Sequence, residues 1–151
     1  MTDLKTNHQN KLKEIFSLVE YKNVLLESDY ISIGKLPGFI TDPHINIQWQ
    51  SQQRTPEFVG GGDKITNIYK LDFIKKPSNP IDQLNETNLE YITNSLNDFS
   101  TTFMNYFFEN GFRFGAENTP WYSANQTGQS ELKKLESNSF YISIILEIIN
   151  Y

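Results

Sequence analysis

Hydrophobic side chains recur every three or four residues in two stretches of the chain, which is the pattern of an amphipathic helix. The stronger stretch covers residues 86–109, and its apolar stripe consists of Leu89, Ile92, Leu96, Phe99, Phe103 and Tyr106. Asn110-Gly111 follows it and is suited to end a helix. The weaker stretch covers residues 11–21 and carries Leu12, Ile15, Phe16 and Val19 on one side. The pattern therefore predicts a short helix at 11–21 and a long helix at 86–109.

Apolar and polar side chains alternate in three other stretches, as they do in the strands of a half-buried sheet. These predicted strands cover residues 44–50, 65–75 and 139–150. Residues 112–115 predict a further short strand, whereas residues 51–64 and 116–137 are polar and predict loops. This order of elements indicates an α+β fold, in which a mostly antiparallel sheet packs against the N-terminal helix and the long second helix. We expect a single domain over residues 1–151, because that length is typical of one domain.

The last predicted strand is apolar on both faces, which is unexpected for a sheet that helices cover on one side only. Alternation places Phe140, Ile142, Ile144, Leu146 and Ile148 on one face, and Tyr141, Ile145, Ile149 and Tyr151 on the other, where Ser143 and Glu147 interrupt the apolar residues. The stretch is too short for a membrane-spanning helix, which needs about 20 apolar residues, and its Ile and Tyr side chains favour a strand. We expect the first face to meet the core and the second to meet a neighbouring subunit, with cover by a helix of the same chain as the alternative. Arg113, in the predicted short strand, is expected to be exposed or to lie at such an interface.

Composition and charge narrow the classes of function. The chain contains no cysteine, so it offers neither disulfides nor thiolate chemistry. Its formal net charge of −5 argues against broad binding to nucleic-acid phosphates, which requires clustered basic side chains. The polar N-terminal residues 1–14 lack the apolar core of a signal peptide. We therefore expect a protein of the cytoplasm or of a virion, with no membrane association and no sequence-specific nucleic-acid binding.

Side chains suited to catalysis or metal binding are few and scattered. His8 and His44 are the two histidines, and Asp42 beside His44 does not complete a metal site, because such sites need three or four ligands. The three glycines at 60–62 precede a predicted strand and lack the spacing of a phosphate-binding loop, so a flexible hairpin loop is expected. No nucleophile elbow is present. We expect no catalytic site, no cofactor and no metal ion, and therefore a protein that is not an enzyme.

The order of these elements resembles that of the tail terminator, or tail completion, proteins of long-tailed bacteriophages, which act in head–tail joining. The matching stretches are NKLKEIFSLVEY, HINIQWQ, ITNIYKLDFIKK, NLEYITNSLNDFSTTFMNYFF and FYISIILEIINY. The resemblance implies a structural virion protein that forms a hexameric ring, caps the finished tail tube and joins it to the head connector. It implies as partners further copies of the chain, a tail tube protein and a connector or neck protein. The implied location is the head–tail junction of the virion, after assembly in the host cytoplasm, and no catalytic residues carry over.

Two other classes of function stay open at this point, because a fold does not determine a function. Another phage neck or baseplate adaptor, or an intracellular protein-interaction domain, would share the fold and the apolar last strand. An unrecognised enzyme or ligand-binding domain would instead require a large pocket with convergent polar groups.

Overall fold

The computed structural model describes residues 3–38, 40–56, 62–77, 85–115, 118–135 and 139–151. The main sheet consists of β3 (Ile31–Ile33), β4 (His44–Pro56), β5 (Asp63–Lys75), β6 (Ser123–Gln129), β7 (Lys133–Leu135) and β8 (Ser139–Asn150). A separate hairpin pairs β1 (Glu20–Tyr21) with β2 (Val24–Leu25). The helices are α1 (Leu4–Phe16) and α2 (Glu86–Glu109), with two short 3₁₀ helices, η1 (Ser28–Tyr30) and η2 (Phe112–Phe114).

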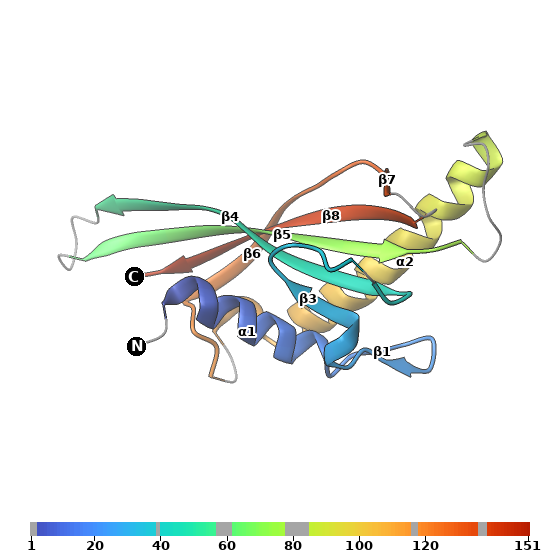
Figure 1. The fold of residues 1–151 in the computed structure, drawn as a ribbon. Coiled ribbons are helices and arrows are strands. Elements are labelled where there is room, and N and C mark those ends of the chain that lie inside the picture. The colour runs from blue at the N-terminus through green and yellow to red at the C-terminus, as the bar shows by residue number, and fades with distance from the viewer. Residues whose placement is uncertain (1–2, 39, 57–61, 78–84, 116–117, 136–138) are drawn as a thin grey trace.

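Both long helices lie on the same face of the main sheet (Figure 1). The strand order is β3-β4-β5-β8-β6, and β7 also pairs with β8. β3 runs parallel to β4, and the other neighbours in this sheet are antiparallel. The predicted α+β fold with a mostly antiparallel sheet is therefore confirmed.

The core between the sheet and the helices is built around aromatic rings. The ring of Phe73 on β5 lies 6.5 Å from that of Phe16 on α1, and 5.3 Å and 6.1 Å from those of Phe99 and Phe103 on α2. All four side chains are fully buried. Aromatic pairs at these separations contribute about 0.5–1.5 kcal/mol each beyond the area they bury. This cluster joins both helices to the centre of the sheet.

The predicted second helix and last strand are confirmed, since α2 covers residues 86–109 and β8 covers residues 139–150. The predicted strand at 65–75 is also confirmed, although β5 begins at Asp63. Among the described helices, none is long and apolar enough to cross a membrane.

The prediction of the first helix at 11–21 is wrong at both ends, because α1 begins at Leu4 and ends at Phe16. Asp3 caps its first turn, where the Thr6 N–H donates to Asp3 Oδ1 at 2.7 Å. The polar start of α1 is partly buried, and His8 is 0% exposed. The ring nitrogens of His8 form hydrogen bonds with residues far away in the sequence, and a local sequence pattern cannot predict such contacts. Residues 20–21 leave the helical path because they pair with β2.

The predicted loop at 51–64 is wrong over most of its length. β4 continues to Pro56, and its residues 51–56 pair with residues 63–68 of β5. The β8 strand pairs with the other side of β5 as far as Ile65, and the ends of β4 and β5 project beyond it (Figure 1). Residues 51–56 of β4 show no alternation of apolar and polar side chains, because all of these side chains are exposed. Backbone hydrogen bonds between β4 and β5 hold this part of the two strands together. Of the three glycines at 60–62, the first two lie outside the described residues.

Two further segments differ from the prediction. Residues 112–114 form η2 rather than a strand, and Gly111 and Gly115 at its ends adopt left-handed φ angles of 76° and 79°. The predicted loop at 116–137 contains β6 and β7, which both pair with β8. Most side chains of β6 are polar, so the strand is determined by its pairing with β8 rather than by its own sequence.

Candidate functional site

The helices leave one face of the main sheet uncovered (Figure 1), and the pairing of β5 with β8 places three of the predicted interface residues on that face. Tyr141, Ile145 and Ile149 lie on this uncovered face and are partly exposed. Leu146 and Ile148 face the helices and are fully buried. The alternation in the sequence thus placed both sets of side chains, because successive residues of a strand point to opposite faces. Contact of the partly exposed set with a neighbouring subunit stays a prediction.

A buried polar cluster divides this apolar row at Ser143. The Ser143 hydroxyl donates to Asp72 Oδ1 at 2.6 Å, and the Gln48 amide donates to Asp72 Oδ2 at 3.1 Å. Lys70 Nζ lies 3.6 Å from the same carboxylate. Burial raises the pKa of Asp72, while the Ser143 hydrogen bond and the Lys70 charge act in the opposite direction. The cluster therefore supplies polar partners to the buried Asp72 carboxylate and links β4, β5 and β8.

His44 fastens the segment that follows β3 to the same face. Its Nε2 lies 2.8 Å from Ser32 Oγ, and its Nδ1 lies 2.8 Å from Thr41 Oγ1. Each hydroxyl also donates to a further acceptor, Ser32 to Asn46 Oδ1 at 2.7 Å and Thr41 to the carbonyl oxygen of Pro43 at 2.8 Å, so the ring lies within a connected hydrogen-bonding network. Burial, and to a smaller extent the charge of Lys13, lowers the pKa of His44 to about 4. The ring is therefore neutral near pH 7 and serves as a structural hydrogen-bonding group.

The second histidine is also part of a hydrogen-bonded core. The Tyr69 hydroxyl lies 2.7 Å from His8 Nδ1, and His8 Nε2 lies 2.9 Å from Asn150 Oδ1. Burial lowers the pKa of His8, so the neutral ring is favoured. Asp42, which the sequence placed beside a histidine, instead accepts the backbone N–H of Lys76 at 3.0 Å. Within the described ranges, no three His, Cys, Asp or Glu side chains gather in an arrangement that could hold a metal ion.

The other two predicted interface residues are Arg113, which lies in η2 and donates to Asn125 Oδ1 on β6, and Tyr151, which follows β8. The Arg113 guanidinium lies 5.7 Å from the ring centre of Phe114, and the rings of Tyr122 and Tyr151 are 4.9 Å apart. Phe114, Tyr122 and Tyr151 are 77%, 66% and 65% exposed. Aromatic residues and arginine are enriched at protein interfaces. Sequence reasoning missed Phe114 and Tyr122 because it placed them in a strand and a loop, where exposure does not follow from any pattern.

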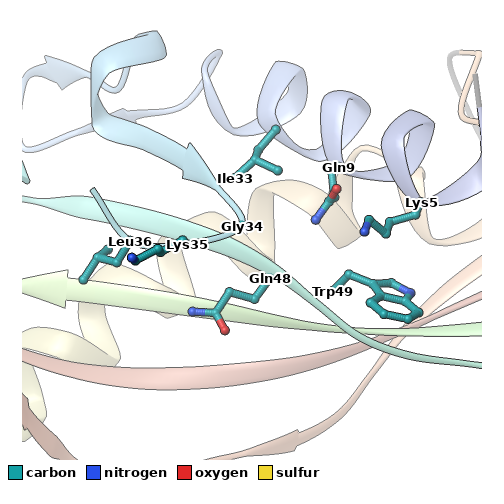
Figure 2. Close-up of a pocket in the computed structure, with 8 residues that line it drawn as sticks. All are labelled: Lys5, Gln9, Ile33, Gly34, Lys35, Leu36, Gln48 and Trp49. Atoms are coloured by element: carbon teal, nitrogen blue, oxygen red, sulfur yellow. The ribbon is translucent and has the colours of Figure 1, made fainter. Parts of the chain in front are cut away.

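An open groove lies between the first half of α1 and β4 (Figure 2). Its volume is about 540 Å³, and its lining residues are Lys5, Gln9, Ile33, Gly34, Lys35, Leu36, Gln48 and Trp49. Lys5 Nζ lies 5.0 Å from the ring centre of Trp49, which is 37% exposed. The Trp49 indole N–H donates to Asn67 Oδ1 at 2.9 Å, which holds the ring in place. The groove combines an aromatic wall, two amines and two amides, and the sequence reasoning did not find it because its residues come from separate elements.

Comparison with known proteins identifies a shared fold. The chain matches no protein-family model, and a search of curated proteins returns no match. Among solved structures, it is similar to a chain in a structure described as the virion of a native gene transfer agent particle. The TM-score is 0.55, the sequence identity is 8%, and the alignment covers 98% of each chain. The two chains thus share their fold over nearly their whole lengths.

Proposed function

We propose that this chain is a structural virion protein of the tail terminator type, a ring subunit that caps a tail tube and joins it to the head connector. The fold is shared from end to end with a chain described as part of a gene transfer agent virion, which supports a role in particle assembly. The order of the elements supports the tail terminator assignment in particular. The role is one of assembly and includes no catalytic step.

The observation that carries the proposal is the set of partly exposed apolar side chains on the uncovered face of β8, where Glu147 stands between Ile145 and Ile149. Ile145 and Ile149 are partly exposed there, and the register places Ile145 opposite Lys70 and Ile149 opposite Thr66 of β5. Partly exposed isoleucines on a sheet face gain roughly 25 cal/mol for each Å² of apolar surface that association removes from water. Exposed apolar surface of this kind marks protein contacts, and oligomers of soluble proteins are mostly closed and symmetric. Further copies of the chain, a tail tube protein and a neck protein are the proposed partners.

The proposal is tested by comparing substitutions on the two faces of β8. Ile145→Asp places a charge on the uncovered face, and association would have to remove that charge from water, so the variant should stay folded but fail to assemble. Leu146→Ala should instead reduce the free energy of unfolding by roughly 2–5 kcal/mol, because it opens a cavity in the core. Asn94→Asp, on an exposed position of α2, is the matched control for adding a negative charge. Native mass spectrometry measures assembly, and urea titration measures stability.

The proposed ring interface is rejected if Ile145→Asp forms the same oligomer as the unaltered protein. It is also rejected if Ile145→Asp unfolds the monomer as severely as Leu146→Ala does, since both faces would then belong to one core. The terminator assignment has its own assay, in which tail tubes polymerise with and without the protein. Tubes that grow to the same length in both cases would exclude a terminator and favour another neck or baseplate adaptor.

A further inference from the structure

Among the described residues, none pairs with the outer edge of β4 from Gln48 to Pro56. β3 pairs with β4 only between residues 31–33 and 45–47. The Gly34 N–H adds one last bond to Ile47 O at 2.8 Å, and its left-handed φ of 83° lets the chain turn away. In the described part of the chain, no strand lies against residues 48–56 on that side. An unpaired edge of this length is a template for another extended segment.

The backbone groups that face this edge can be identified. N–H and C=O of one strand residue point to the same side, and successive residues alternate. The Ile47 carbonyl faces β3. The backbone N–H and C=O of Trp49, two residues later, therefore point to the same side, which is the free edge. The irregularity between Trp49 and Ser51 brings Ser51 opposite Ile68 and shifts the alternation by one residue. Gln52 and Arg54 therefore also present their backbone N–H groups outward.

The groove of Figure 2 lies beside this edge and supplies side-chain contacts. In the picture, Lys5 of α1 lies above the Trp49 ring, and Lys35 follows Gly34 at the end of β3, with its amine on the side of Leu36. The exposed Trp49 ring offers a flat apolar surface. A volume of about 540 Å³ is sufficient for several side chains of an extended segment.

The charges of the groove indicate what kind of segment fits. Lys5 and Lys35 are not within ion-pair distance of a carboxylate among the described residues, in a chain whose formal net charge is −5. Two amines without a salt bridge to any described residue line the groove beside this strand edge, and they favour carboxylate side chains on the added segment. We propose that the free edge of β4 and the adjoining groove bind an extended acidic segment of a partner protein by strand addition. This site is separate from the proposed ring face on β8.

The site can be tested with a synthetic probe, the peptide acetyl-Thr-Val-Glu-Val-Glu-Val-Thr-amide. Trp121 is 5% exposed and Trp49 is 37% exposed, so the change in tryptophan fluorescence on binding reports mainly Trp49. We expect saturable binding below about 1 mM peptide and binding at least about tenfold weaker for the same peptide with Lys in place of Glu. The double variant Lys5→Gln with Lys35→Gln should weaken acidic binding about tenfold, whereas the control Lys133→Gln on β7 should not.

A second pair of variants tests the backbone contact. Gln52→Ala keeps the outward N–H and should bind the acidic peptide as the unaltered protein does. Gln52→Pro removes that N–H at an edge position where proline is tolerated, and should lose most of the binding. Native mass spectrometry of Gln52→Pro should show the same oligomer as the unaltered protein, which separates this site from the proposed ring face.

Three results would overturn the inference. The first is the absence of binding up to about 1 mM acidic peptide. The second is equal binding by the acidic and basic peptides, or by Gln52→Pro and Gln52→Ala. The third is a change in Trp49 fluorescence when the protein concentration is raised in the absence of peptide, if that change is lost in Gln52→Pro. This result would mean that a second copy of the chain occupies the edge.

Discussion

Acidification should destabilise this protein measurably through His44, the histidine that fastens the segment after β3 to the sheet. The pKa of its ring falls from an ordinary value of 6.5 in the unfolded chain to about 4 in the folded protein, because burial disfavours the charged form. A group whose folded pKa is depressed binds more protons in the unfolded state at pH values between the two pKa values. The free energy of unfolding therefore falls as the pH falls through this window.

The size of the effect follows from the two pKa values. One unit of pKa difference corresponds to about 1.4 kcal/mol. Between about pH 8 and about pH 5, the unfolded ring becomes mostly protonated while the folded ring stays mostly neutral, so His44 alone should cost about 2 kcal/mol. The full loss, reached below about pH 4, is roughly 3 kcal/mol.

Urea titrations at about pH 8 and about pH 5 measure this loss, with His44→Gln as the matched variant. The variant keeps an amide that can form hydrogen bonds, but it cannot titrate. The loss of stability between the two pH values should be about 2 kcal/mol smaller in His44→Gln than in the unaltered protein. This comparison cancels the contributions of His8 and of the carboxylates. If both proteins lose the same stability over this range, His44 titrates normally when folded and its proposed structural role is wrong.

Three further outcomes are expected in urea titrations. Tyr69→Phe leaves the buried His8 Nδ1 without the hydroxyl that lies 2.7 Å away, and should cost about 1–3 kcal/mol. Gly115→Ala should cost more than about 1 kcal/mol, because its φ is 79° and a backbone oxygen stands 3.0 Å from the added Cβ. Asn85→Ala removes the cap that accepts a backbone N–H at 2.9 Å in the first turn of α2 and should cost about 0.5–2 kcal/mol. Its control, Asn94→Ala on an exposed position of the same helix, should cost nothing or stabilise slightly; equal losses for these two variants would contradict the capping role.

The sequence alone determined the elements whose side chains repeat with a clear period. The stripe from Leu89 to Tyr106 defined α2, and the alternation along residues 139–150 defined β8 together with the side chains that face the core. These predictions succeed because side-chain direction follows directly from helix and strand geometry, whatever the rest of the chain does. For the same reason, the sequence located Tyr141, Ile145 and Ile149 on the face that the helices leave uncovered.

Only the tertiary structure decided the elements and sites that depend on distant partners. His8 is buried in a helix because Tyr69 and Asn150, far away in the sequence, satisfy its ring nitrogens. The polar strands β6 and the outer half of β4 exist because β8 and β5 pair with their backbones. The groove beside β4 is assembled from α1, β3 and β4, and its exposed tryptophan and two lysines are not adjacent in the chain. Backbone pairing and the burial of polar groups depend on which segments meet in space, so the periodicity of apolar residues along the chain cannot predict them.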